Sequence, residues 1–154
     1  MVQAREHLTP IFQRNEVLFG HDSTPGLIAF EIEGTDKVKI FRRQDGKIEA
    51  DTAPLHPFML LSGDGALKDW RGEAELQKLE GKGAFSYLAL FPKWNQLEQA
   101  KLHIQNRSGK MPSASDAPYW CLNDPVQQFL LLSGKTHFLG MAFRDLKRLQ
   151  LDIK

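Results

Sequence analysis

The stretch from Ala84 to Phe91 (AFSYLALF) gives the clearest β-strand signal in the chain. It is a short apolar run rich in aromatic residues, it follows the turn sequence Gly81-Lys82-Gly83, and Pro92 ends it. Neighbouring side chains of a strand point to opposite faces. We therefore expect one aromatic face, made of Phe85, Tyr87 and Phe91, and an opposite face, made of Ser86, Leu88 and Leu90.

The elements around this strand predict a β-α-β-β-α-β unit, which is the ferredoxin-like split βαβ pattern. Its longer helix is expected because Leu97, Ala100 and Ile104 recur at helical spacing. In chain order we expect a buried strand (56–61), a short helix that Asp64 caps (65–70), a third element (74–80), the clear strand, the longer helix (95–107) and a last strand (119–122).

A three-stranded meander is predicted ahead of this unit. Residues 27–33 and 37–43 alternate between apolar and charged side chains, as half-buried strands do. A three-residue loop, 34–36, brings opposite charges together on one face and apolar groups on the other. Asp45-Gly46 is a strong hairpin signal that leads into a third strand. The fold class is therefore α+β, with a β-meander packed against the split βαβ unit.

The composition places the chain among globular proteins and excludes several classes. Of 154 residues, 42% are hydrophobic and 25% are charged, with a net charge of +1, which excludes a strongly basic coat. No apolar run approaches the ~20 residues of a membrane span. The single cysteine, Cys121, excludes an internal disulfide and favours a cytoplasmic location. We expect three segments within one compact domain, 1–53, 54–123 and 124–154.

No self-contained active site emerges from the sequence. The five histidines are scattered, without the close spacing of metal ligands. Phosphate-binding glycine loops and nucleophile elbows are missing, and Cys121 lies in an apolar strand, where a thiol is inert. We expect a non-catalytic chain that holds no cofactor.

Two groups of residues are candidates for nucleic-acid binding. The strand 84–91, with Lys82 before it, is similar to the first ribonucleoprotein motif of an RNA-recognition module, and its aromatic face could stack on bases. The alternative is that another layer, for which the meander is available, covers this face. Arg42, Arg43 and Lys47 could bind phosphates, or they could form a solvated surface that acidic neighbours balance.

The C-terminal segment places an acidic residue inside an apolar strand, Leu149-Gln150-Leu151-Asp152-Ile153. A carboxylate is costly there unless it is paired, solvated at the strand end or bound to a metal. Because the chain stops inside this strand, we expect it to be a fragment of a longer protein.

These landmarks together resemble the N-terminal region of family B DNA polymerases, in a bacterial branch of the archaeal and Pol II-like type. The resemblance spans most of residues 16–154 and depends on the order and spacing of the landmarks. They are the strands of 27–43 with the Asp45-Gly46 turn, the strand Leu55-His56-Pro57-Phe58-Met59-Leu60, the strand and helix of 87–100, the helix that begins Asp124-Pro125-Val126-Gln127-Gln128-Phe129, and the run 149–153, which resembles the first exonuclease motif.

The resemblance implies a domain that positions single-stranded template DNA and supports the exonuclease domain beside it. The implied partners are this DNA and the exonuclease and palm domains of the same monomeric polymerase, which uses Mg²⁺ in its full-length form. Asp152 matches the metal-binding aspartate of the exonuclease motif, whereas Lys154 stands where the family has glutamate. We expect neither nuclease nor polymerase turnover from this chain.

In archaeal members the domain also holds a pocket that senses uracil in the template. Pro57 and Phe58 match its Pro-Tyr portion. The arginine expected in the helix after Asp124 is missing, because Gln127, Gln128 and Phe129 stand there, and the tyrosine of the first strand is not evident near Ala29. We expect uracil sensing to be absent or much weakened.

Two other functions stay open from the sequence. One is a stand-alone RNA-recognition-like module that binds single strands, and the other is a purely structural or protein-interaction domain. The residues expected to contact nucleic acid are Arg42, Arg43, Lys47, Phe58, Lys82, Phe85 and Tyr87.

Overall fold

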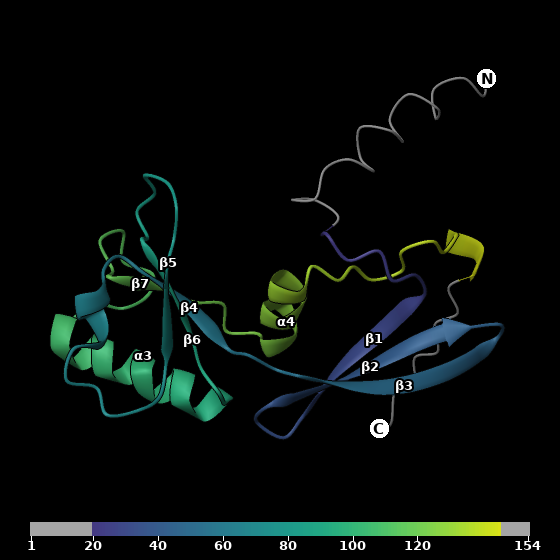
Figure 1. Ribbon diagram of the computed structural model, residues 1–154, viewed down its shortest axis with the longest axis horizontal. Coiled ribbons are helices and arrows are strands. Elements are labelled where there is room, and N and C mark those ends of the chain that lie inside the picture. Colours follow the sequence, from purple (N-terminus) through teal and green to yellow (C-terminus); the bar gives the residue numbers. More distant parts are fainter. Residues whose placement is uncertain (1–19, 146–154) are drawn as a thin grey trace, which may run out of the picture. The chain divides into compact units, whose positions relative to one another are not determined.

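A computed structural model describes residues 20–145, which form a mixed α+β structure with two antiparallel sheets and two α-helices (Figure 1). The elements are β1 (Leu27–Glu33), β2 (Lys37–Gln44), β3 (Lys47–Pro54), β4 (Phe58–Leu61), the 3₁₀-helix η1 (Asp64–Leu67), β5 (Glu75–Lys78), β6 (Tyr87–Leu90), α3 (Trp94–Ser108), β7 (Tyr119–Trp120), α4 (Pro125–Ser133) and the 3₁₀-helix η2 (Phe143–Asp145).

The chain forms two compact units. The described part of the first unit comprises residues 20–29, 40–51 and 133–145, and the second comprises 30–39 and 52–132. The segment boundaries expected after residues 53 and 123 stay predictions. The expected acidic strand 149–153, including Asp152, lies outside the described residues, as does Lys154. Within the described residues no helix is long and apolar enough to cross a membrane.

The predicted three-stranded sheet is present, in the order β1-β2-β3. Residues 34–36 form the three-residue loop between β1 and β2. Asp45 and Gly46 join β2 to β3 with φ of 51° and 79°, the left-handed pair that a tight hairpin turn requires. The side chains of β1 alternate between half-buried and exposed positions from Ile28 to Glu33, as the sequence pattern predicts.

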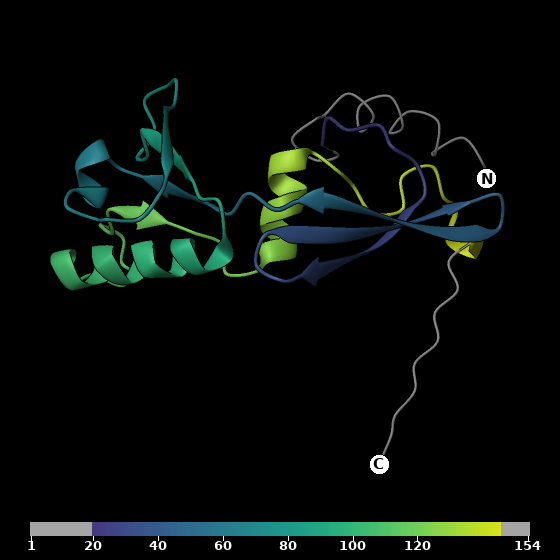
Figure 2. The same cartoon turned by 60° about the horizontal axis from the view of Figure 1, so that its bottom comes forward.

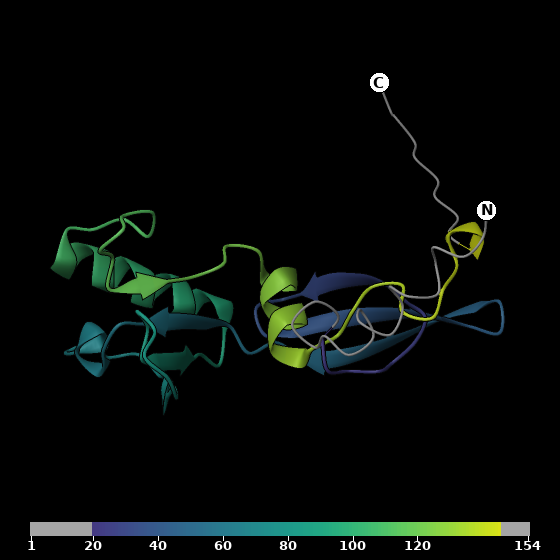
Figure 3. The ribbon, with the colours of Figure 1, turned by 90° about the horizontal axis from the view of Figure 1, so that it is seen from above.

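The second sheet has the strand order β5-β6-β4-β7, and its three neighbouring pairs are antiparallel. The register sets Met59 opposite Ala89 and Leu61 opposite Tyr87. Helix α3 lies along one face of this sheet (Figures 2 and 3). The core between them consists of Met59, Leu61, Ala89, Phe91, Leu97, Ala100, Ile104 and Tyr119.

Helix α3 begins and ends where its sequence predicts. The N–H of Trp94 donates to the carbonyl of Thr35, in the β1–β2 loop, at 2.8 Å, which satisfies one of the unpaired donors of the first turn. At the other end Gly109 has φ of 67°, and its N–H donates to the Gln105 carbonyl. This left-handed residue is a common helix stop because glycine has no Cβ to clash.

The short helix predicted for residues 65–70 is not formed over that range. Residues 64–67 form one 3₁₀ turn, its N-cap is Gly63, and the Asp64 side chain makes no capping hydrogen bond. Two glycines within three positions, Gly63 and Gly65, disfavour a longer helix. Lys68 then returns to an extended conformation, with ψ of 134°.

We predict that shortening Leu97 destabilises the second unit far more than shortening Leu102, on the same helix. Leu97 is fully buried in the core, whereas Leu102 is 57% exposed. Leu97→Ala leaves a cavity and should lower the free energy of unfolding by about 2–5 kcal/mol, and Leu102→Ala by less than about 1 kcal/mol. Urea denaturation followed by tryptophan fluorescence measures both variants. Equal losses would contradict the packing of α3.

Candidate functional site

The aromatic face of β6 is the face that α3 covers. Phe91 is 1% exposed and meets the ring of Trp70 edge-on, with 5.6 Å between ring centroids. Tyr87 is half-buried and packs against the same core. Phe85, just before β6, is also half-buried. The sequence left open whether this aromatic face is exposed or covered by another layer. In the structure it is covered, and the covering element is α3 rather than the meander.

The opposite face of this sheet is mainly aliphatic. Strand alternation assigns to it the half-buried Leu60, Leu88 and Leu90. Trp120 of β7 pairs with Leu60, so it belongs to the same face, and it is 38% exposed. Trp120 was not among the residues expected at the site, although its alternation with the buried Tyr119 was a signal for it.

Pro57 and Phe58, the residues that match the family's template-base pocket, are both buried. Phe58 is 3% exposed, and Pro57 belongs to the fully buried residues. Neither residue lines any of the three cavities described below. The Phe58 ring is therefore not placed to stack on a base in this conformation.

A buried amide, that of Gln128, holds the start of β4. Its Oε1 accepts a hydrogen bond from the Phe58 N–H at 2.6 Å, and its Nε2 donates to the Leu122 carbonyl at 2.7 Å. The same Nε2 lies 3.3 Å from the sulfur of Cys121. Burial raises the pKa of the Cys121 thiol to about 11, so this thiol stays protonated and unreactive at neutral pH.

The basic residues Arg42 and Arg43 bind backbone carbonyls within the first unit. Arg42 donates from Nε to the Pro25 carbonyl at 3.1 Å, and Arg43 donates from Nη1 to the Asp145 carbonyl at 2.5 Å. As neighbours on β2, the two side chains point to opposite faces of the sheet. They therefore do not form one clamp on a single phosphate. Lys47 is exposed at the start of β3, and Lys82 is exposed in the β5–β6 connection of the second unit.

An ion pair joins two segments of the first unit that are far apart in the sequence. Lys135 Nζ lies 2.7 Å from Asp22 Oδ2. Burial by itself would raise the pKa of Asp22, but hydrogen bonds from Lys135 and Thr24 outweigh it and lower the pKa to about 2. A cavity of about 410 Å³ lies beside this pair, and it carries both charge signs, since Arg42 and Lys135 line it together with Glu49 and Asp51.

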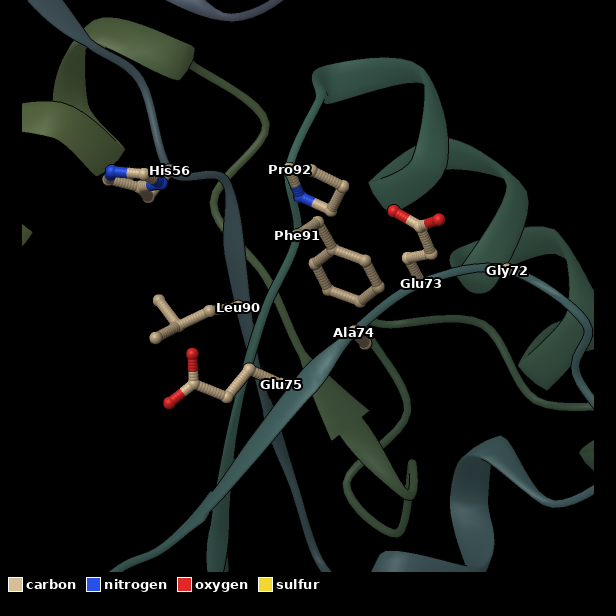
Figure 4. A pocket seen from close by; sticks show the side chains of 8 residues that line it. All are labelled: His56, Gly72, Glu73, Ala74, Glu75, Leu90, Phe91 and Pro92. Carbon is tan, nitrogen blue, oxygen red and sulfur yellow. The ribbon is translucent and has the colours of Figure 1, made fainter.

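The largest of the three cavities, about 790 Å³, opens at the start of β5 in the second unit (Figure 4). Acidic and apolar residues line it. The carboxylates of Glu73 and Glu75 lie on different sides of the cavity, and the His56 ring lies apart from both (Figure 4). The lining residues are His56, Gly72, Glu73, Ala74, Glu75, Leu90, Phe91 and Pro92.

A third cavity, of about 330 Å³, lies between η1 and the end of α3. Its Arg107 donates to the Lys68 carbonyl, so this guanidinium already has a structural partner. Among residues 20–145, no group of three His, Cys, Asp or Glu side chains is arranged to hold a metal ion.

Comparison of the chain with protein-family models, curated proteins and solved structures found no match. The resemblance to family B DNA polymerases therefore rests on the sequence landmarks. The structure places Arg42, Arg43 and Lys47 in the first unit and Phe58, Lys82, Phe85 and Tyr87 in the second. The structural role of Gln128, the exposed Trp120 and the acidic cavity were not expected from the sequence patterns.

We predict that Gln128→Leu strongly destabilises the second unit. The variant leaves the buried Phe58 N–H without a partner and leaves the Leu122 carbonyl only the weak Cys121 thiol donor, which should cost about 1–3 kcal/mol in free energy of unfolding. The matched control is Gln127→Leu, because Gln127 is the exposed neighbour on the same helix. Urea denaturation compares the two variants, and a Gln128→Leu protein as stable as the control would contradict the role of the buried amide.

We predict that Asp22→Asn weakens the first unit at neutral pH but not in strong acid. The folded pKa of about 2 lies below the ordinary value of 3.8, so the ionised carboxylate stabilises the fold above about pH 4. This contribution, on the order of 2 kcal/mol, is lost as the pH falls from 4 towards 2. Amide hydrogen exchange at Gly26 and Phe138 measures it, with the exposed Glu49→Gln as control. A difference that does not depend on pH would contradict the prediction.

Proposed function

We propose that the chain is a non-catalytic N-terminal domain of a family B DNA polymerase. In this role it positions single-stranded template DNA and supports the exonuclease domain of the same protein. The observation that carries the proposal is the strand order of the second sheet, in which β6 separates β4 from β5. Both are antiparallel to β6 and therefore parallel to each other, which is the arrangement of a split βαβ unit.

This sheet supports the ferredoxin-like part of the proposal with one modification. The connection between β4 and β5 holds only the single 3₁₀ turn η1 where a full helix is expected. The second crossover, between β6 and β7, keeps its complete helix α3 and forms the core with the sheet. We propose that the unit is a ferredoxin-like pattern with a reduced first helix.

Phosphate contacts from the first unit are the main source of the proposed DNA affinity. Arg42 uses Nε for the Pro25 carbonyl, and its guanidinium carries two further nitrogens that can donate to a phosphate. Lys47 is exposed at a hairpin end, where its ammonium can reach a phosphate. Arg43 contributes less, because its Nη1 is held by Asp145. Such contacts give salt-dependent binding with little base preference.

Base stacking contributes less than the sequence suggested. Phe58 is buried, and Phe85 and Tyr87 are each half-buried, with Tyr87 packed on the core, so the expected set offers little open ring surface. The covered aromatic face also removes the main support for a stand-alone RNA-recognition module. We propose that uracil sensing is absent, because the Phe58 N–H is already bonded to Gln128 in the segment that matches the pocket.

The alternative function is a protein-interaction domain. The observation that favours it is the half-exposed aliphatic face of Leu60, Leu88 and Leu90, since apolar surface of this kind serves protein contacts better than base stacking. This alternative predicts no measurable affinity for single-stranded DNA at low salt.

Titration with a fluorescein-labelled oligothymidine tests the proposed function. Replacing Arg42 and Lys47 together by glutamine should weaken binding by about three- to tenfold, and lower the slope of log K against log salt by about 1.4, that is, 0.7 per lost cation. The matched control replaces two exposed lysines of the second unit, Lys68 and Lys78, by glutamine. Salt-independent binding, or an equal loss in the control, would refute the proposal.

A further inference from the structure

Strand β5 is an edge strand with an open side. It is the first strand in the order β5-β6-β4-β7, and all four of its residues are exposed. The Leu79 N–H donates to the Ser86 carbonyl across the β5–β6 pair. In an antiparallel ladder the backbone groups alternate in direction, so those of Gln77 also point to β6. The N–H and carbonyl groups of Leu76 and Lys78 therefore point outwards, where they can accept a further strand.

The 790 Å³ cavity opens at the N-terminal end of this strand. Its apolar part comes from Ala74, Leu90 and Pro92, whereas Glu73 and Glu75 supply two carboxylates (Figure 4). Lysine and arginine are missing from its lining. Gln96 Oε1 accepts from the Glu73 N–H at 2.8 Å, and Gln77 Nε2 donates to Glu75 Oε1 at 2.9 Å, so the surrounding structure holds both acidic residues.

From this geometry we propose that β5 and its cavity bind an extended peptide segment of a partner protein. The peptide adds as a further strand along Leu76 and Lys78, and one of its basic side chains enters the cavity beside Glu75, while Glu73 adds negative charge on the other side of the cavity. Main-chain hydrogen bonds supply affinity, and the acidic cavity supplies specificity. The inference does not depend on the proposed DNA-binding role, which uses residues of the first unit.

Charge complementarity favours a peptide with a basic side chain as the occupant of the cavity. Two carboxylates in a lining that holds no lysine or arginine repel the phosphates of a nucleic acid and attract a lysine or arginine side chain. Burying the apolar stem of such a side chain against Leu90 and Pro92 adds to the attraction. The cavity therefore fits a side chain that is long, apolar along its stem and cationic at its tip.

A second copy of this chain fits less well. An added β5 must pair its outward-pointing residues, Leu76 and Lys78, with those of the first copy. Leu76 pairs with the core residue Ala89, and alternation places Lys78 on the same face as Leu76. Glu75 and Gln77 occupy the other face, so a second β5 brings no cation to Glu75.

The experiment uses the full chain and a synthetic peptide of alternating residues, Thr-Val-Arg-Val-Thr-Val, blocked at both ends. Its arginine lies on the Glu75 face, and its valines lie on the Leu76 face. We expect NMR shift changes confined to residues 72–78 and 90–92, with slowed amide exchange at Leu76 and Lys78. Replacing the peptide arginine by glutamate should abolish the shift changes.

Three protein variants separate the two parts of the site. Leu76→Pro removes an outward N–H but keeps the ladder to β6, as edge strands tolerate, and should weaken binding at least about tenfold. Glu73→Gln with Glu75→Gln keeps the shape and should weaken binding about tenfold, roughly threefold for each charge. The control is Glu80→Gln, an exposed glutamate outside the cavity lining, and it should bind normally.

Several results would overturn the inference. The first two are equal binding of the arginine and glutamate peptides, and unchanged peptide binding by the double glutamine variant. The third is that oligothymidine, in place of the peptide, shifts the same residues. The fourth is self-association of the chain that Leu76→Pro abolishes.

Discussion

The second unit depends on one buried side-chain amide. Gln128 binds the Phe58 N–H and the Leu122 carbonyl, and so connects the start of β4 to the segment that leads into α4. Because β4 lies inside the sheet and pairs with both β6 and β7, fixing its first residue also fixes the register of its neighbours. The register in turn directs Met59 and Leu61 to the face that α3 covers. An apolar residue at position 128 would leave the buried Phe58 N–H without a partner and the Leu122 carbonyl with only the weak Cys121 thiol donor.

Local patterns predicted the elements, because periodicity and turn chemistry act over a few residues. The Asp45-Gly46 turn, the three buried positions of α3 and its stop at Gly109 all follow from such signals. The packed face of β6 does not follow from them. Both faces of residues 84–91 carry large apolar side chains, so alternation separates the two faces without indicating which one meets a helix.

The candidate sites were harder to predict because their residues come from separate stretches. The acidic cavity combines the approach to β4, the loop before β5 and the end of β6. Gln128 bonds to a residue 70 positions away, and nothing in its own helix distinguishes it from Gln127. The basic pair on β2 was interpreted as a phosphate site, whereas in the structure Arg42 and Arg43 also bind carbonyls of distant segments.

The two proposed partners are of opposite charge, as is the surface to which each is assigned. Arg42 and Lys47, in the first unit, suit an anionic strand, and the cavity of Glu73 and Glu75, in the second, suits a cationic side chain. A nearly neutral chain, with a net charge of +1, can present both surfaces because each charge acts locally over about a Debye length. One ligand is therefore poorly suited to both, since a polyanion that gains from the first surface is repelled by the second.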